Sequence, residues 1–280
     1  MAASVASVSA KATASGTSLV IDKPSDVVSG NLMVMQVVTD RTAGSGAAST
    51  GWTQIQQTDH TDDTNGGGEM VTFYKVAGGS EPSTYTVTFT DAGESVGYIA
   101  KVTGNPSTGF LTTSSEAQND STSTTATGGT VTPNTTDSLI LFFVGGNRSG
   151  TTVTTSAYSI ATSNPTWTEQ WDSNQSGPFA AMASATRPEL TATGAASATL
   201  SSSQKSLVHM VVIGGQVDIS PSVLSVASSV IDPALDLTTV VSADTVSVTT
   251  SVQAPTVSMP TPDWTNENKN IATCINQDKS

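Results

Sequence analysis

The stretch "SGNLMVMQVV" at residues 29–38 decides the fold, because "TDSLILFFVG" at residues 136–145 matches it. Both runs are apolar at consecutive positions and rich in Val, Leu, Ile and Met. A short continuous apolar run of this kind is typical of a strand that is covered on both faces. We therefore expect two central strands, one in each copy of a repeated unit.

Three further pairs of segments support the repeat, and they follow the first pair in the same order. "GWTQIQQTD" at 51 matches "TWTEQWDSN" at 166, and "MVTFYKVAGGSEP" at 70 lines up with "FAAMASATRPELT" at 179. "YTVTFTDAGESVGYIAKVTG" at 85 lines up with "ASATLSSSQKSLVHMVVIGG" at 196. The offset stays near 110 residues, so the sequence predicts two copies at about residues 20–104 and 130–215.

The strands themselves are indicated by alternation and by composition. In "STYTVTFTD", Tyr85, Val87 and Phe89 alternate with threonines, which predicts a strand with one solvated face. Only 12% of residues are charged, and a Thr- and Val-rich chain favours strands over helices. We expect an all-β fold, an antiparallel, jelly-roll-like β-sandwich of two quasi-repeated halves over residues 1–217. Two separate tandem domains are the alternative, but their cores would be thin.

The overall charge and the cysteine count exclude several classes. A net charge of −13 and a pI near 4.2 repel phosphate backbones and anionic lipids, so we expect no nucleic-acid and no membrane partner. The single cysteine, Cys274, excludes intrachain disulfides. The N-terminus has no basic segment followed by an apolar run, and no window resembles a membrane span. We expect a chain made and folded in a cytoplasm.

The composition changes after residue 217. "SVLSVASSVIDPALD" at 222–236 and "DTVSVTTSVQAPTVS" at 244–258 form a second, shorter repeat. The first copy has spacing that fits a short helix, but the prolines and the threonines of the second copy favour an extended chain. A disordered linker is one interpretation, and strand pairing with sister subunits or a larger assembly is the other. We favour pairing, because a linker has no need of so many apolar residues.

Residues 218–280 are therefore expected to be an extended Val/Ser/Pro-rich tail for anchoring or oligomerisation. Trp264, near the end of the chain, is a candidate anchor in a partner's pocket. The candidate interface residues of this tail are Val223, Val226, Val230, Val248, Val252 and Trp264.

The stretch "TDHTDDTNGGGEM" at residues 58–70 is the densest cluster of polar chemistry in the chain. Its carboxylates suit calcium, although their spacing does not fit an EF-hand loop. The matching segment of the second copy keeps turn residues and loses most acids, so a solvated hairpin tip is the preferred interpretation. The candidate metal ligands are Asp59, Asp62, Asp63 and Glu69, and no other cofactor is expected.

No catalytic residue is assigned from the sequence. The only two histidines are His60, in that loop, and His209, whose apolar neighbours place it in or beside a sheet. No nucleophile-elbow, zinc-protease or phosphate-loop motif occurs. Paired carboxylates for glycoside hydrolysis remain open, but aromatic residues are only 5% of the chain. We expect a protein that is not an enzyme.

The tryptophans divide into two groups. Trp52 and Trp167 occupy matching places in the two copies, which favours core filling in each half. Trp171 occurs only in the second copy, and it is the candidate for an exposed contact with a glycan.

The series "GWTQI", "VTFYKVAGGSEPSTYTVTF", "GYIAKVTG", "VTPNTTDSLILFFVGG" and "WTEQWD" resembles a sandwich module of tailed-bacteriophage virion proteins of the decoration or fibre-like kind. The resemblance covers about residues 20–215. It implies a non-enzymatic virion structural protein, commonly trimeric, with no catalytic residues to transfer. No receptor-binding head follows the module, which is a departure from fibre proteins.

These observations predict a capsid decoration protein or a head, neck or tail appendage, assembled in the host cytoplasm and located in the virion. Its partners would be other virion proteins and further copies of itself, with a trimer favoured. The rival hypothesis is a carbohydrate-binding host-adhesion module that binds a surface glycan through Trp171 and the 59–69 loop.

Overall fold

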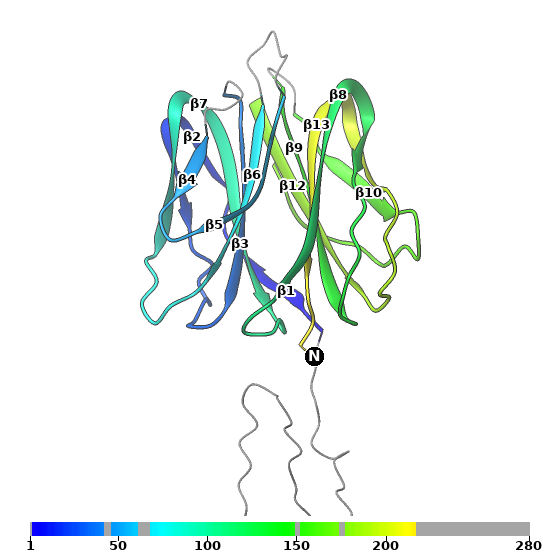
Figure 1. Cartoon of the computed structure of the whole chain (residues 1–280). Helices are drawn as coiled ribbons and strands as arrows, with labels where there is room; N and C mark the ends of the chain where they lie inside the picture. Colours follow the sequence, from blue (N-terminus) through cyan, green and yellow to red (C-terminus); the bar gives the residue numbers. More distant parts are fainter. Residues whose placement is uncertain (1, 42–45, 61–67, 149–151, 174–176, 217–280) are drawn as a thin grey trace, which may run out of the picture. The chain divides into compact units, whose positions relative to one another are not determined.

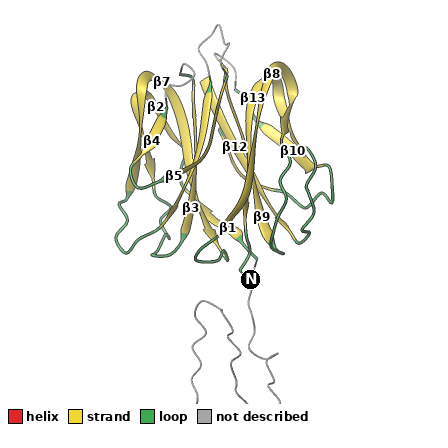
Figure 2. Cartoon of the chain, viewed as in Figure 1, coloured by secondary structure: helices red, strands yellow, loops and turns green. Residues whose placement is uncertain are grey.

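The fold of this chain is known from a computed structural model, which describes residues 2–41, 46–60, 68–148, 152–173 and 177–216. These residues form thirteen β-strands, and no helix occurs among them (Figure 2). All pairs of neighbouring strands are antiparallel. The predicted all-β, antiparallel class is confirmed. The predicted tail, residues 218–280, lies outside the described residues.

The first sheet has seven strands and contains only the first half of the chain. Its main order is β1-β7-β3-β6-β5, and β2 and β4 both pair with β7. The strands are β1 (Ser4–Val8), β2 (Ala12–Asp22), β3 (Leu32–Thr39), β4 (Ala47–Ser49), β5 (Thr53–Asp59), β6 (Glu69–Val76) and β7 (Thr84–Thr103).

The second sheet has six strands and contains only the second half. Its main order is β10-β13-β9-β12-β11, and β8 pairs with β13. The strands are β8 (Leu111–Gly128), β9 (Ser138–Arg148), β10 (Thr155–Ile160), β11 (Thr168–Asp172), β12 (Gly177–Arg187) and β13 (Ala196–Ile213).

The two sheets share one pairing scheme. In the first sheet the long strand β7 is followed by the apolar strand β3, then by β6 and the edge strand β5. In the second sheet the long strand β13 is followed in the same way by β9, β12 and the edge strand β11. Both edge strands carry a β-bulge at the same place, at Ile55 in β5 and at Gln170 in β11. In addition, β8 runs along β13 as β1 and β2 together run along β7. The repeated unit thus begins with these first strands, ahead of residues 20 and 130.

The two apolar stretches that open the repeat are central strands, as predicted. Every residue of β3 is buried, and Ser138 to Gly146 of β9 are buried too. The alternation predicted for the first part of β7 is also confirmed, because Tyr85, Val87 and Phe89 are buried while the threonines between them are exposed.

Three apolar cores hold the described residues together. One lies between the two sheets and takes side chains from both, including Leu32 and Val34 of β3 and Leu141 and Phe143 of β9. Each sheet also covers its other face with its own strands. Figure 1 shows β2 and β4 on the outer side of one half, and β8 and β10 on the outer side of the other. The resulting outer cores contain residues of one half only.

This arrangement combines both alternatives considered for the sequence. The shared core makes the halves a sandwich-like pair, while the separate cores resemble those of tandem domains. The separate cores arise because β7 and β13 are long enough to bend and contribute to two layers. At the centre of the shared core, a Cβ on Gly145 would lie 2.6 Å from Val38, so this glycine allows the sheets to approach closely.

Arg41 holds the bend of β7 and is only 2% exposed. Its Nε donates to the carbonyl of Asp91 at 2.7 Å, and its Nη2 donates to the carbonyl of Gly93 at 2.8 Å. Nη2 also donates to the carbonyl of Gly16 in β2, and the guanidinium carbon lies 3.6 Å from the centre of the Phe89 ring. One buried cation therefore satisfies the carbonyls that the bend exposes.

Candidate functional site

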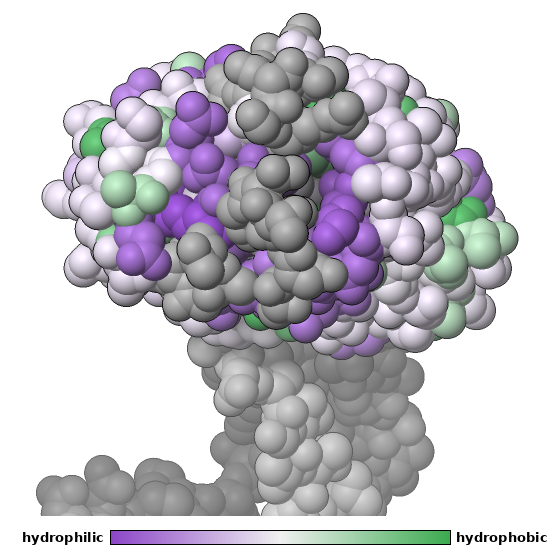
Figure 3. Space-filling view, turned by 90° about the horizontal axis from the view of Figure 1, so that it is seen from above, coloured by the Kyte–Doolittle hydropathy of each residue, from purple (hydrophilic) through white to green (hydrophobic). Residues whose placement is uncertain are grey.

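The acidic stretch at 58–70 forms a β-hairpin, as its turn residues predicted. β5 and β6 are antiparallel neighbours with Asp59 opposite Glu69, and the His60 amide donates to the Gly68 carbonyl at 2.9 Å. The tip, residues 61–67, lies outside the described residues, and so do the candidate ligands Asp62 and Asp63. The end of the molecule that carries this turn is rich in hydrophilic residues (Figure 3).

The base of the hairpin is not the solvated loop that was expected. Glu69 is fully buried, and its carboxylate accepts a hydrogen bond from Gln57 Nε2 at 2.6 Å. His60 is 1% exposed, and its Nδ1 lies 3.1 Å from Asp120 in β8. This contact lowers the pKa of the Asp120 carboxyl. Among the described residues, no group of three or more His, Cys, Asp or Glu side chains is arranged to hold a metal ion.

His209 is the centre of a second set of polar contacts between the sheets. It is fully buried in β13, as the sequence predicted, and burial lowers its pKa to about 3. Its Nδ1 lies 3.2 Å from Thr72 Oγ1 of β6. Its Nε2 lies 3.0 Å from Thr58 Oγ1 of β5, which donates to the Glu116 carboxylate at 2.7 Å.

The direction of these hydrogen bonds is fixed by the carboxylate. An ionised Glu116 only accepts, so the Thr58 hydroxyl must donate to it and must accept from His209 Nε2–H. His209 Nδ1 then has the lone pair that accepts from Thr72. A neutral imidazole in one tautomer satisfies the whole chain, so this histidine links the sheets and is held away from the pKa that a general base needs.

Trp171 is buried, and its proposed exposed contact with a glycan was wrong. The side chain is 6% exposed and lies in the core between the sheets. Its ring stacks on Tyr98, with centroids 5.0 Å apart and planes 12° apart, and its Nε1 donates to Gln36 Oε1 at 2.8 Å. Gln36 in turn donates to the Val144 carbonyl at 2.9 Å. The extra tryptophan of the second copy thus fastens β11 to the opposite sheet.

The paired tryptophans pack as their symmetry suggested. Trp52 is buried in the outer core of the first half, with its ring edge-on to Tyr85 at 5.1 Å. Trp167 is half-buried against the outer core of the second half, and its Nε1 donates to Asn164 at 3.0 Å. Each residue directly precedes the edge strand of its sheet, β5 or β11, and packs against the outer core of its own half.

Two neighbouring carboxyl groups of β11 have raised pKa values. Burial raises the pKa of Asp172, and burial with the charge of Asp172 raises the pKa of Glu169. Asp172 accepts a hydrogen bond from the Thr155 amide at 2.6 Å, at the start of β10. Asp172 therefore has a structural partner at the start of β10.

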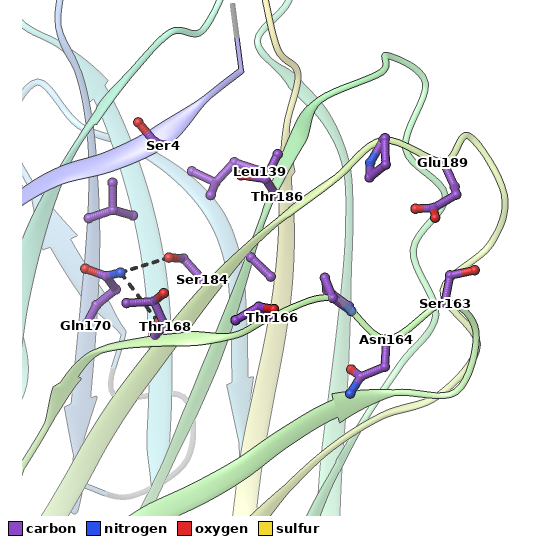
Figure 4. Close-up of a pocket in the computed structure, with 14 residues that line it drawn as sticks. Ser4, Leu139, Ser163, Asn164, Thr166, Thr168, Gln170, Ser184, Thr186 and Glu189 are labelled. Carbon is purple, nitrogen blue, oxygen red and sulfur yellow. Dashed lines mark hydrogen bonds between the residues drawn. The ribbon is translucent and has the colours of Figure 1, made fainter.

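An open groove of about 780 Å³ lies beside β11 (Figure 4). Its floor is formed by β11 and β12, and β1 and the turn before β11 form its sides. Gln170 Nε2 donates to Ser184 Oγ at 2.9 Å within it. The lining residues are Ser4, Val5, Leu139, Ser163, Asn164, Pro165, Thr166, Thr168, Gln170, Ser184, Ala185, Thr186, Pro188 and Glu189.

No sequence motif marked this groove, because the Ser, Thr, Asn and Gln residues of its lining come from three separate segments. Comparisons of the chain with protein-family models, with curated proteins and with solved structures each find no match. Within the described ranges, no helix is long and apolar enough to cross a membrane. The candidate interface residues Val223, Val226, Val230, Val248, Val252 and Trp264 lie outside those ranges.

Proposed function

We propose that the chain is a non-enzymatic structural component of a tailed-phage virion, a capsid decoration or a head, neck or tail appendage. In this proposal the paired sheets form the outward module, and residues 218–280 hold it to the particle and to sister subunits, with a trimer as the assembled form. Each curled half is proposed to be a jelly-roll variant, because its long strand contributes to two layers.

The observation that carries the proposal is where the sandwich ends. The amide of Gln216 donates to the carbonyl of Gly104 at 2.9 Å, just after β13 leaves the sheet. Among the described residues, the three apolar cores extend from Ala3 to Ile213. In this proposal the valines of residues 218–262, which lie outside the described residues, serve the assembly.

A second observation supports a role as a scaffold. The chain has only two histidines, and both are buried in contacts that join β5 to the second sheet. Groups that often act as general bases are thus committed to holding the halves together. Ser and Thr side chains on outer strands such as β8 give a polar, weakly charged exterior, which suits a particle surface.

The experiment compares the full chain with a 1–217 truncation in the phage that encodes it. We expect the full chain in purified particles by mass spectrometry and immunogold labelling. The truncated chain should stay soluble and folded but be absent from particles. Sedimentation velocity should show a trimer for the full chain and a monomer for the truncation.

Two results would contradict different parts of the proposal. Particles that retain the truncated chain would refute attachment through the tail. Particles that lack the full chain would refute the virion role itself. A full-length chain with Val248→Ser and Val252→Ser is the matched variant, since it keeps the length of the tail and removes apolar area from it.

The alternative function is a carbohydrate-binding host-adhesion module. Trp171 was the tryptophan predicted for its glycan site, but this side chain is buried in the core. A polar groove elsewhere in the second half is the observation that keeps this function under consideration.

A further inference from the structure

We propose that the groove beside β11 binds a short neutral oligosaccharide. The groove lies where the second half departs from the first, and the proposal holds whether or not the chain is attached to a virion. Thr53 and Thr168 occupy equivalent positions in the two copies. Tyr74 is opposite Thr53 in β5 and β6, and Ser184 is opposite Thr168 in β11 and β12. Tyr74 and Ser184 are therefore equivalent positions too. The bulged residues Ile55 and Gln170 correspond in the same way.

The first half fills the space that the second half leaves open. Tyr74 and Ile55 pack against the shared core, and the Tyr74 ring meets Phe110 edge-on at 5.3 Å. In the second half the same two positions are Ser184 and Gln170, which line the groove. The groove is therefore a specific departure from the repeat, made by replacing two large apolar side chains with small or polar ones.

The lining indicates the class of ligand. Eight of the fourteen lining residues have a hydroxyl or amide side chain: Ser4, Ser163, Asn164, Thr166, Thr168, Gln170, Ser184 and Thr186. Such groups donate and accept hydrogen bonds without charge, as the hydroxyls of a sugar require. The volume, about 780 Å³, is within the range of roughly 300–1,000 Å³ that is usual for small-ligand sites.

Charged ligands are disfavoured by the same lining. None of the described residues that line the groove is a lysine, arginine or histidine, so an anionic sugar or a phosphate finds no cation among them. Its one carboxylate, Glu189, lies 3.3 Å from Arg187 Nε, and this ion pair offsets its charge. Pro165 and Pro188 supply apolar ring surfaces on which the C–H faces of a sugar can pack.

An added peptide strand fits the groove less well. β11 is an edge strand, but the bulge at Gln170 breaks the regular spacing of its backbone groups. Figure 4 shows the Gln170 amide turned toward Ser184 and Thr168 along the floor, with Ser163 and Glu189 at the opposite end. This arrangement presents side chains, rather than a free backbone ladder, to a ligand.

The first test uses the full-length chain on an array of neutral, sialylated and sulfated oligosaccharides, with hits measured again by calorimetry. We expect neutral oligosaccharides to bind with dissociation constants from micromolar to about a millimolar. Binding only of acidic sugars, or no binding to any oligosaccharide at millimolar concentration, would overturn the proposal. Binding of a synthetic peptide of residues 244–258 without any sugar would also overturn it.

The second test fills the groove with the first half's own side chains. The double variant Ser184→Tyr and Gln170→Ile should weaken neutral-sugar binding at least tenfold, because the same pair fills the corresponding space elsewhere in the molecule. The control Thr86→Tyr adds the same ring at an exposed position of β7 and should bind normally. Unchanged affinity in a filled variant with native circular dichroism would refute the site.

A milder variant guards against a failure of the double variant to fold. Gln170→Ala removes the amide that bonds Ser184 but leaves the floor of the groove in place. We expect it to weaken neutral-sugar binding by about three- to tenfold with a normal melting temperature. Sugar affinity equal to that of the wild-type chain would contradict the assignment. Since none of these assays uses particles, their outcome is separate from that of the virion proposal.

Discussion

Replacing Trp171 by alanine tests most directly whether the two sheets form one folding unit. The side chain is 6% exposed and contacts both sheets, through Tyr98 of β7 and Phe143 of β9. Its indole N–H also supplies a hydrogen bond to Gln36 Oε1 at 2.8 Å. We expect this substitution to destabilise the whole described unit rather than β11 alone.

The magnitude follows from area and hydrogen bonding. Removing a buried tryptophan side chain exposes or empties about 150 Å² of apolar contact, which at about 25 cal/mol per Å² is about 4 kcal/mol. Leaving Gln36 Oε1 buried without its donor adds about 1 kcal/mol or more. The expected loss is therefore about 5 kcal/mol, a large part of the roughly 5–15 kcal/mol by which domains are stable.

The assay is urea unfolding followed by far-UV circular dichroism and by tryptophan fluorescence. With a denaturant dependence of about 3 kcal/mol per molar, the midpoint for Trp171→Ala should fall by roughly 1.7 M. The two signals should give one coincident transition in the wild-type chain, because the shared core couples the halves.

Two variants serve as controls. Trp171→Phe keeps most of the apolar contact and loses the hydrogen bond, so about 1–2 kcal/mol should be lost. Trp167→Ala removes a half-buried ring from one outer core, and about 2 kcal/mol should be lost. If Trp171→Ala costs no more than Trp167→Ala, then Trp171 does not join the sheets as described.

The remaining predictions concern the polar contacts. Because the pKa of His209 falls from 6.5 to about 3 on folding, the unfolded chain binds the extra proton, and the unfolding free energy should fall as pH drops from 6.5 toward 3. His209→Gln should make the unfolding free energy depend less on pH between pH 7 and 5. An unchanged slope would show that other groups cause the dependence. Thr58→Val leaves His209 Nε2–H without an acceptor and should cost about 1–3 kcal/mol in urea unfolding, whereas Glu116→Gln should cost under about 1 kcal/mol. Arg41→Lys cannot reach the carbonyls of the β7 bend together and should cost about 3 kcal/mol by the same measurement; a near-neutral result would contradict its role.

The fold class could be predicted because the sequence repeats its own pattern. An apolar run at each central strand, matching turns and an offset near 110 residues indicate two equivalent sheets. The first strand of each unit was missed because β1, β2 and β8 are made largely of Ser, Thr and Ala, with few apolar residues to mark them. Strands of this composition are held by their neighbours more than by their own pattern.

One error of register hid the groove. The alignment of residue 70 with residue 179 places Tyr74 opposite Ala183, whereas the strand registers pair Tyr74 with Ser184. Side chains alternate between faces along a strand, so a shift of one residue assigns every side chain to the wrong face. With that shift, the contrast between a filled and an open site cannot be seen in the sequence.

The burial of His60 and of Trp171 could not be predicted from the sequence, for a related reason. Trp171 lies on the edge strand β11 and His60 directly follows the edge strand β5, both among polar neighbours, and each contacts a strand of the other half. The residues next to Thr58 and His60 are Gln, Thr and Asp, and local sequence of this kind predicts a solvated turn. The burial of these side chains is decided by contacts between residues far apart in the sequence, as for Gln36 with Trp171.

The two halves close the space between the sheets in different ways. At the β5 edge, apolar packing of Tyr74 with Phe110 and the hydrogen bonds of His60 and His209 close the space between the sheets. At the β11 edge, Trp171 closes one end of that space and small polar residues leave the other end open. A duplicated unit permits this asymmetry, because both copies hold the sheets together while the second also leaves a groove at its edge. Substitutions that make the halves more alike at Ser184 should therefore raise stability and remove the groove together.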